Sequence, residues 1–464
     1  MAIQAVSKAK ANSSRVVLAP ADLFNPFFLD NRVEPRRLLP LFSSDEIGFS
    51  TLYLKSLPEK YIPSPGLLQI LQVLDKPVPS QDFPAFLRSL GATVESVFIG
   101  PKRVLLDISY GCNLDCVYCR RHSPLNPGDP EKAKPEKQES YMTLNHIQGI
   151  LKDAYDLMVE EFLLVGGGEP TINPEFKEII RAVKAHGFGL NFSTNGLALK
   201  PDLVDVILEI GVDNMTVSVS GVTPKSYKAT HPSKNKRIFD MLFRNFDYLN
   251  YRRRKMVQET QKEFVKPFCI FLHVLTTDNY HEVVDMALMG AEYGFDTIWF
   301  KLVHPSEWSR HLCLNSDQAE QVKAQIKAVK KLAPRLKIKI DDYMDQEIDH
   351  LSDDGTWSGY FHDKKRCFVG WNFAYIDLSK DYSFCCGDKI VGLHQSFTGF
   401  YDFWVSSQYK KARHCAKNIN YGAKNIPTYN GGAIIDDFCK ACDNTNFNEE
   451  MELDISRFGL KDLI

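Results

Sequence analysis

The sequence lacks the features that mark membrane-spanning and nucleic-acid-binding proteins. No apolar run reaches the roughly 18 residues that a transmembrane helix needs. The 464 residues carry a formal net charge of only -2, which gives no reason to expect nucleic acid or an anionic membrane as a partner. A basic run at residues 251–255 is expected to be a solvated helix end, because no interleaved aromatic and basic residues surround it.

Cysteine, in contrast, is plentiful. The chain has 11 cysteines, and most of them fall into close groups at positions 112/116/119, 385/386 and 439/442. Such grouping is typical of metal binding and not of a disulfide framework. We therefore expect a protein of a reducing compartment, the cytoplasm.

The middle of the chain has the rhythm of an α/β protein. Short β-rich runs alternate with amphipathic helical patterns, and the expected strands are Val104–Ile108, Phe162–Val165, Leu190–Ser193, Met215–Val219, Phe268–Leu275 and Thr297–Leu302. This alternation predicts a parallel sheet that right-handed crossovers curl into a partial, open β/α barrel of about six strands. Functional groups are then expected at the carboxyl ends of the strands.

The two ends of the chain do not share this rhythm. Residues 1–98 combine a Pro-rich opening with a strand pattern and two helical patterns, at Phe49–Leu54, Leu67–Leu74 and Phe83–Leu90. They predict a small N-terminal α/β or winged-helix-like unit that recognises a partner or merely packs on the barrel. Because the alternation fails again after about residue 350, we expect three domains, at residues 1–98, 99–350 and 351–464.

A CxxxCxxC motif follows the first expected strand. Cys112, Cys116 and Cys119 place three thiols in one turn, where they can hold three irons of a 4Fe-4S cluster and leave the fourth iron open for a non-protein ligand. A structural zinc site is the alternative, but it is normally closed by a fourth ligand, and the nearest further cysteine is Cys269. The aromatic Tyr118, just before the last cysteine, favours the cluster.

A glycine-rich turn follows the second expected strand. Gly166, Gly167 and Gly168 allow close backbone approach to a ligand, and Glu169 comes directly after them. A tight strand–helix turn explains the glycines alone equally well. Because both motifs follow strands, they are expected on the same face of the barrel.

Together these motifs resemble the radical S-adenosylmethionine (SAM) superfamily over roughly residues 103–340. The resemblance implies that Cys112, Cys116 and Cys119 bind a 4Fe-4S cluster and that Tyr118 lies beside the adenine of SAM. It also implies that a GGE motif binds the methionyl amino group, through Gly167, Gly168 and Glu169.

Two further segments resemble SAM-binding parts of this family. Ser193 and Asn195 end the third strand like the family's polar contact to SAM, and Ser218 ends the fourth strand like its SxDG segment. The chain departs from the family at Ser220, where Asp is usual, and at His231, near the position of a common Arg. The resemblance implies SAM contacts for Ser193, Asn195, Ser218 and His231, although turn-forming serines account for the serines equally well.

The C-terminal cysteines resemble the SPASM or twitch extension of radical SAM enzymes. This resemblance implies a second, auxiliary 4Fe-4S cluster with every iron occupied, held by Cys367, Cys385, Cys439 and Cys442. Zinc is the alternative occupant. Cys385 is preferred to Cys386 from twitch-type spacing, and Cys415 is an alternative ligand.

The resemblance implies reductive cleavage of SAM to a 5'-deoxyadenosyl radical that removes hydrogen from a substrate carbon. We expect a peptide or protein substrate that is oxidised, cross-linked or epimerised, with flavodoxin or ferredoxin as electron donor. The alternatives are dehydrogenation or epimerisation of a small metabolite such as a sugar or aminocyclitol, and a non-catalytic metal-binding scaffold. Cys313, after the sixth strand, is a candidate hydrogen donor, whereas Cys269 is interpreted as a buried structural residue.

Overall fold

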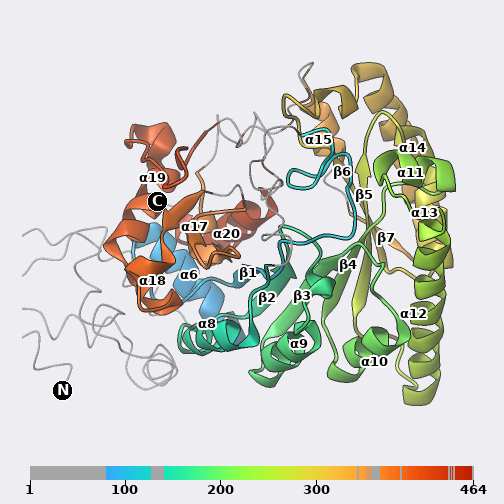
Figure 1. Ribbon diagram of the computed structural model, residues 1–464. Coiled ribbons are helices and arrows are strands. Elements are labelled where there is room, and N and C mark those ends of the chain that lie inside the picture. Colours follow the sequence, from blue (N-terminus) through green and yellow to red (C-terminus); the bar gives the residue numbers. More distant parts are fainter. Residues whose placement is uncertain are drawn as a thin grey trace, which may run out of the picture.

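The computed structural model describes residues 80–126, 140–341, 344–352, 355, 357, 366–386, 389–436, 439, 442 and 445–461. A ten-stranded sheet forms its centre, in the order β10-β9-β8-β1-β2-β3-β4-β5-β6-β7 (Figure 1). The seven strands from β1 to β7 pair in parallel: β1 Arg103–Asp107, β2 Glu161–Val165, β3 Gly189–Thr194, β4 Asn214–Ser218, β5 Phe268–Leu275, β6 Thr297–Leu302 and β7 Lys339–Ile340.

This architecture confirms the predicted partial parallel β/α barrel. Strands β5 and β6 have the predicted bounds, and β1 to β4 each begin one residue earlier than predicted. The helices between the strands cover the outer face of the sheet (Figure 1). They are α8 Leu144–Asp156, α9 Phe176–Ala185, α10 Pro201–Ile210, α11 Pro224–Thr230, α12 Ile238–Thr260, α13 Val283–Glu292, α14 Ser316–Leu336 and α15 Met344–Asp349.

Short 3-10 turns complete the connections, at η3 Ser80–Asp82, η4 Pro170–Ile172, η5 Tyr280–Glu282, η6 Arg310–Leu312, η7 His394–Ser396 and η8 Ile419–Tyr421. Within the part of the chain that the structure describes, no helix is both long enough and apolar enough to cross a membrane.

The two faces of the barrel strands differ in burial. Residues such as Val104, Phe162 and Phe271 point toward the helices and form the core. The alternate residues, such as Leu163 and Asn191, are only half-buried and line the inner face of the barrel. The strands therefore leave an accessible inner surface toward which their carboxyl ends present side chains.

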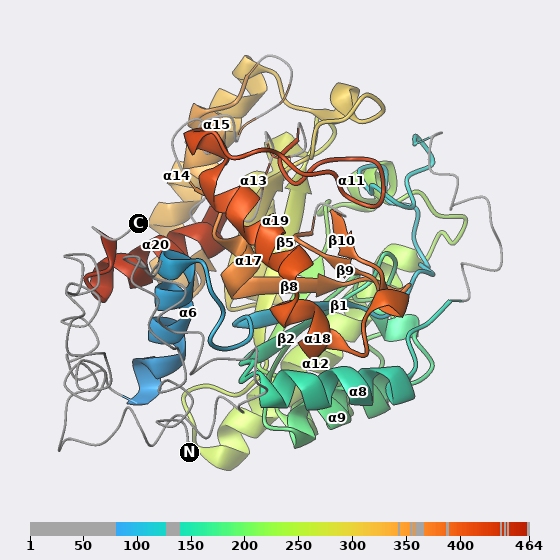
Figure 2. The ribbon, with the colours of Figure 1, turned by 90° about the vertical axis from the view of Figure 1, so that its left-hand side faces the viewer.

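The sheet extends beyond the six predicted strands at both edges. The short β7 joins β6, and a C-terminal segment adds three strands beside β1: β8 Phe373–Ile376, β9 Tyr382–Ser383 and β10 Ile390–Gly392 (Figure 2). Strand β8 is parallel to β1 and covers an edge that would otherwise expose unpaired backbone groups. The C-terminal region is thus continuous with the barrel sheet.

The C-terminal helices gather beyond β1 together with an N-terminal helix (Figures 1 and 2). They are α17 Val369–Asn372, α18 Phe400–Val405, α19 Ser407–Asn418 and α20 Thr445–Arg457. Helix α6, Phe83–Val94, packs on α20, where the rings of Phe86 and Phe458 lie 5.3 Å apart. It contains the predicted helical pattern at Phe83–Leu90, whereas the patterns at Phe49–Leu54 and Leu67–Leu74 lie outside the described residues.

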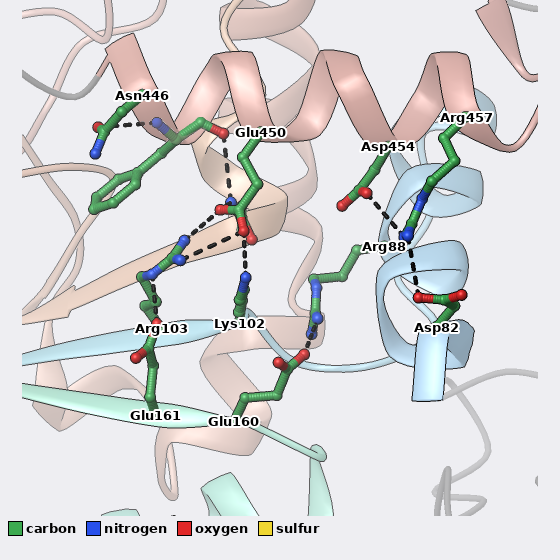
Figure 3. Close-up of polar contacts among 12 residues, drawn as sticks. Asp82, Arg88, Lys102, Arg103, Glu160, Glu161, Asn446, Glu450, Asp454 and Arg457 are labelled. Carbon is green, nitrogen blue, oxygen red and sulfur yellow. Dashed lines mark hydrogen bonds and ion pairs between the residues drawn. The ribbon is translucent and has the colours of Figure 1, made fainter. Parts of the chain in front are cut away.

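A polar network joins α20 to the start of the barrel (Figure 3). The Glu450 carboxylate accepts hydrogen bonds from Lys102 and Arg103, which open β1, and from Asn372 at 3.0 Å. Arg457, at the end of the same helix, pairs with Asp82 at 3.1 Å. These contacts link helix α20 to the barrel and also to η3, the turn that precedes helix α6.

Candidate functional site

The three motif cysteines lie on the loop that leaves β1. The Cys119 N–H donates to the Cys116 carbonyl at 3.0 Å and makes a turn, and the Val117 N–H anchors that turn to Thr230 O at 3.0 Å. Burial raises the pKa of Cys112 to about 12 and the pKa of Cys116 well above its usual value, and the charge of Cys119 raises both further. Half-buried thiols that raise one another's pKa are stabilised as thiolates by a compensating cation, which iron would supply.

The cysteines line a cavity of about 350 Å³. The other lining residues come from the ends of β2, β3 and β4 and from the loops beside them, and include Gly166, Gly167, Gly168, Glu169, Ser193, Asn195, Ser218 and His231. In the described part of the chain, no three His, Cys, Asp or Glu side chains converge on one metal ion. Because cluster thiolates each bind a different iron, cysteines spread around a cavity fit a 4Fe-4S cluster.

The glycine-rich turn is packed directly against the cysteine loop. A Cβ on Gly168 would lie 1.9 Å from the Gly111 carbonyl oxygen, so no other residue fits at this position. The backbone N–H groups of Gly168 and Glu169 donate to Ser109 O and Gly111 O at 2.9 and 2.8 Å. The sequence predicts that the glycines allow close backbone approach to a ligand. In the structure they first of all allow the turn to approach the cysteine loop.

Glu169 is buried and its carboxylate is surrounded by donors. One oxygen accepts from the hydroxyl groups of Thr171 and Thr194 at 2.5 and 2.6 Å and from the Thr171 N–H at 3.2 Å, and the other accepts from the Asn195 N–H at 2.7 Å. Burial raises the pKa of the Glu169 carboxyl, and these hydrogen bonds oppose that shift. The side chain thus fixes the ends of β2 and β3 relative to each other.

Asn195 continues this framework to the cysteine loop. Its side-chain amide donates to Asn113 Oδ1 at 2.6 Å, and its own Oδ1 accepts from the Leu197 N–H at 3.1 Å. Asn113 lies next to Cys112, so the end of β3 helps to position the first cysteine. The predicted SAM-contacting role of Asn195 stays a prediction beside this structural one.

Tyr118 belongs to a buried hydrogen-bond chain. Its hydroxyl bonds His231 Nε2 at 2.9 Å and Ser220 Oγ at 3.0 Å, and Ser220 Oγ accepts from the Val274 N–H at 2.9 Å. Burial lowers the pKa of His231 to about 3, so the ring is neutral. A neutral ring supplies no charge to a carboxylate, whereas its Nε2 shares a hydrogen bond with the Tyr118 hydroxyl and its Nδ1 lies 2.9 Å from Thr230 Oγ1.

This chain accounts for the departure from the family pattern at Ser220. A serine there, fully buried, joins the end of β4 to β5 and to the cysteine loop. Ser193 and Ser218 line the cavity as the sequence predicts, and their contacts to SAM stay predictions.

The C-terminal cysteines also come together in part. The pKa of Cys367 is raised to about 11 by burial and by the charge of Cys439. The charge of Cys385 acts on the nearby Lys389 and Tyr409. Cys442 follows Cys439 on one turn, with its N–H on the Cys439 carbonyl at 3.3 Å.

The remaining cysteines have other surroundings. Cys415 lies on α19 and its thiol faces Asn425 Oδ1 at 3.5 Å. Cys269 is buried in β5, where its thiol donates to Pro267 O at 3.5 Å. Cys313 packs in a small apolar cluster with Val117 and Tyr118, beside the cysteine loop. Cys313 as hydrogen donor stays a prediction, as do the ligand roles of the auxiliary cysteines.

The sequence reasoning missed a polar group where β1 and β8 end side by side. Asp107 accepts from the Gly167 N–H at 2.7 Å and from the Tyr375 hydroxyl at 3.4 Å. Asp377 follows β8, and its pKa is raised to about 7 by burial and by the charges of Asp381 and Asp107. This polar group becomes apparent only when β8 is known to pair with β1. That pairing joins residues far apart in the sequence, so no local pattern shows it.

His122 was missed as well. The side chain is 3% exposed, its Nε2 has no hydrogen-bond partner among the described residues, and the ring lines the cavity. Its backbone N–H donates to Cys119 Sγ at 3.3 Å. A buried nitrogen without a partner, in a residue that lines the cavity, is a candidate for a hydrogen bond to a polar ligand.

Residues 106–289 match the family model described as the radical SAM superfamily. This match covers the strands, the cysteine loop and the glycine-rich turn that build the cavity. The central domain of this chain is therefore a radical SAM domain.

The chain is similar to several characterised proteins. It is 30% identical over 118 residues to the mycofactocin maturase MftC of Mycobacterium ulcerans, a match that covers 25% of this chain and only 28% of the maturase. It is 22% identical over 363 residues to the PqqA peptide cyclase of Ruegeria pomeroyi, which covers 77% of this chain and 84% of the cyclase.

A solved structure shares the fold over most of the chain. Streptococcus suis SuiB bound to S-adenosylmethionine superposes with a TM-score of 0.51 and 16% identity, over 79% of this chain and 77% of SuiB. The similarity extends beyond the radical SAM domain and includes part of the C-terminal region.

Proposed function

We propose that this protein is a radical SAM enzyme that removes hydrogen from a carbon of a peptide or protein. One observation carries the proposal: a single cavity brings Cys112, Cys116 and Cys119 together with the glycine-rich turn and Glu169. A 4Fe-4S cluster bound there supplies the electron that cleaves SAM into methionine and a 5'-deoxyadenosyl radical.

The chain's own residues prepare the cavity for this chemistry. Glu169 and Asn195 hold the ends of β2 and β3 against the cysteine loop, so the cavity needs little rearrangement to accept a cluster. Tyr118 is held by His231 and Ser220 at one wall, where its ring offers a surface for an adenine. The orphaned Nε2 of His122 offers a hydrogen bond to a polar part of the ligand.

The peptide substrate is proposed from the relatives. One similar protein is named a peptide cyclase and another a maturase. The cyclase match runs over 77% of this chain and 84% of the cyclase. We further propose that Cys367, Cys385, Cys439 and Cys442 hold an auxiliary 4Fe-4S cluster and that a flavodoxin or ferredoxin donates electrons.

The substrate class is tested with the reconstituted full chain under anaerobic conditions, with SAM and dithionite. Synthetic peptides and a panel of sugars and aminocyclitols are each incubated in heavy water, and products are analysed by mass spectrometry. A peptide that changes mass and raises 5'-deoxyadenosine formation supports the proposal. Modification of the metabolites alone contradicts it, and zinc in place of iron supports the scaffold alternative.

The same experiment separates the reaction types. Loss of two hydrogens without deuterium uptake indicates oxidation or cross-linking. Deuterium uptake without loss of hydrogen indicates epimerisation, and we then expect the uptake to vanish in Cys313→Ala. Uptake that persists in this variant contradicts Cys313 as the hydrogen donor.

A further inference from the structure

Buried hydrogen-bond donors surround the C-terminal cysteines. We propose that Lys389, Tyr409 and Asn448 form a donor shell around the auxiliary cluster and raise its reduction potential. This inference rests on the proposed function, because it requires a cluster at the auxiliary cysteines. The three donors come from the start of β10, from α19 and from α20, so the shell forms only in the folded C-terminal region.

Lys389 places a buried positive charge beside two of the cysteines. The side chain is 2% exposed, and its Nζ lies 2.7 Å from Ile434 O, 2.7 Å from Asp436 Oδ1 and 3.2 Å from Cys439 Sγ. An ammonium group has three protons, and a longer contact to Ala433 O at 3.4 Å completes its set of acceptors. The thiol is therefore one of the partners that allow this lysine to be buried.

Tyr409 contributes an unpartnered hydroxyl to the surroundings of the C-terminal cysteines. The residue is fully buried, and its Oη has no hydrogen-bond partner among the described residues. Its ring lies 5.9 Å from the ring of Phe384, the residue that precedes Cys385. A buried hydroxyl without a partner is costly, and a cluster sulfur is the acceptor that would satisfy it.

Asn448 supplies the third buried donor. Its Oδ1 accepts from the Phe368 N–H at 2.6 Å, which fixes the amide plane and leaves Nδ2 buried without a hydrogen-bond partner. Phe368 directly follows Cys367 in the chain, so the fixed amide lies near this cysteine. The buried Nδ2 is thus a donor available to a cluster sulfur there.

Donors and positive charge near a cluster favour its reduced form. Reduction adds negative charge, and hydrogen bonds to sulfur and a nearby ammonium group both stabilise that charge. Asp436 offsets part of the Lys389 charge, but only the ammonium group and the other donors can hydrogen-bond a reduced cluster. The donor shell therefore raises the potential of the auxiliary cluster.

The test is a redox titration of the reconstituted full chain followed by EPR spectroscopy. The barrel cluster is identified as the signal that changes when SAM is added, and the other signal belongs to the auxiliary cluster. The variants are Lys389→Met, Tyr409→Phe and, as a matched control, Lys417→Met. Lys417 is a buried lysine of the same region that donates to Ala92 O and Thr93 O, at 2.8 and 3.0 Å, and to no cysteine.

We expect the auxiliary midpoint potential to fall in Lys389→Met and, by less, in Tyr409→Phe, while the barrel cluster keeps its potential in both. Lys417→Met should leave both potentials in place. An unchanged auxiliary potential in Tyr409→Phe and Lys389→Met overturns the inference. If Lys389→Met loses the cluster, Tyr409→Phe decides alone, because it removes only one unpartnered oxygen.

Failure of the proposed function has a different signature. A wild-type chain whose iron content stays the same when Cys367, Cys385, Cys439 and Cys442 are all replaced by alanine holds no auxiliary cluster. In that case there is no second EPR signal to titrate, and the inference fails together with the proposed auxiliary cluster. A second signal with an unshifted potential contradicts the donor shell alone.

Discussion

Glu169 is a carboxylate whose hydrogen-bonding capacity is used mainly within the protein. Its oxygens accept from Thr171, Thr194 and the Asn195 backbone. Glu169→Gln replaces an acceptor by an NH2 group that faces donors. We expect a loss of roughly 1–3 kcal/mol of unfolding free energy and a weaker affinity for SAM. Denaturant unfolding of the iron-free chain and equilibrium dialysis with SAM measure both, and unchanged values contradict this role.

Gly168 is the residue at which the two motifs meet. Gly168→Ala would place a Cβ 1.9 Å from the Gly111 carbonyl oxygen, which forces the cysteine loop away from the turn. We expect poor iron incorporation on anaerobic reconstitution, measured as iron per chain. The matched control is Gly149→Ala in α8, where a Cβ meets nothing within 4 Å and the helix should gain roughly 0.5–1 kcal/mol. Equal iron content in both variants contradicts the prediction.

Single residues of the site differ in how far the sequence reveals them. Cys112, Cys116 and Cys119 are recognisable because their spacing within one turn is local. The partners of Tyr118 are not, since Ser220 and His231 lie about a hundred positions along the chain and only the folded barrel brings them near. The sequence predicts which residues line the cavity better than it predicts what holds them.

At the scale of elements, the barrel strands were predictable because each is a short apolar run beside an amphipathic helix. Strand β7 has two residues and β8 has four, too few for periodicity to show. Their place in the sheet depends on pairing with distant strands, β8 with β1 for example. For the same reason the polar group at the end of β8 was missed.

Asp377, in the turn between β8 and β9, makes this hairpin sensitive to pH. Its pKa is raised to about 7 from a usual 3.8, chiefly by burial, so the folded state favours the protonated form. The stability that Asp377 contributes to the folded wild-type protein therefore falls as the pH rises from about 4 through about 7. Asp377→Asn keeps the oxygen that accepts from the Asp381 N–H at 2.8 Å and removes the charge.

We expect Asp377→Asn to melt at a higher temperature than wild type at pH 8 and at nearly the same temperature at pH 4. Thermal unfolding of the iron-free chain across this range measures the difference. A gap between the two proteins that does not grow with pH contradicts the raised pKa.

At the scale of the whole molecule, Glu450 links the C-terminal helix to the barrel (Figure 3). Burial raises its pKa, but hydrogen bonds and charge from Arg103, with further bonds from Lys102 and Asn372, lower it to about 2. Its contribution to stability is complete above about pH 4.5 and is lost as the pH falls through about 2.

Glu450→Gln should therefore destabilise the chain at pH 7, by roughly 1–3 kcal/mol, because the negative charge and one of the two oxygens that face Arg103 and Lys102 are lost. The difference from wild type should shrink as the pH falls toward 3. Denaturant unfolding at several pH values measures it, with the exposed pair of Lys177 and Asp202 as control through Asp202→Asn. A difference that is independent of pH contradicts this account of the link.

The central claim is that this molecule cleaves SAM reductively at the cavity built from the cysteine loop and the glycine-rich turn. The most direct measurement is the formation of 5'-deoxyadenosine by the anaerobically reconstituted, dithionite-reduced full chain, quantified by liquid chromatography and mass spectrometry. The account predicts product from wild type and none when Cys112, Cys116 and Cys119 are all replaced by alanine. No product from an iron-loaded wild-type chain, or equal product from both proteins, would contradict it.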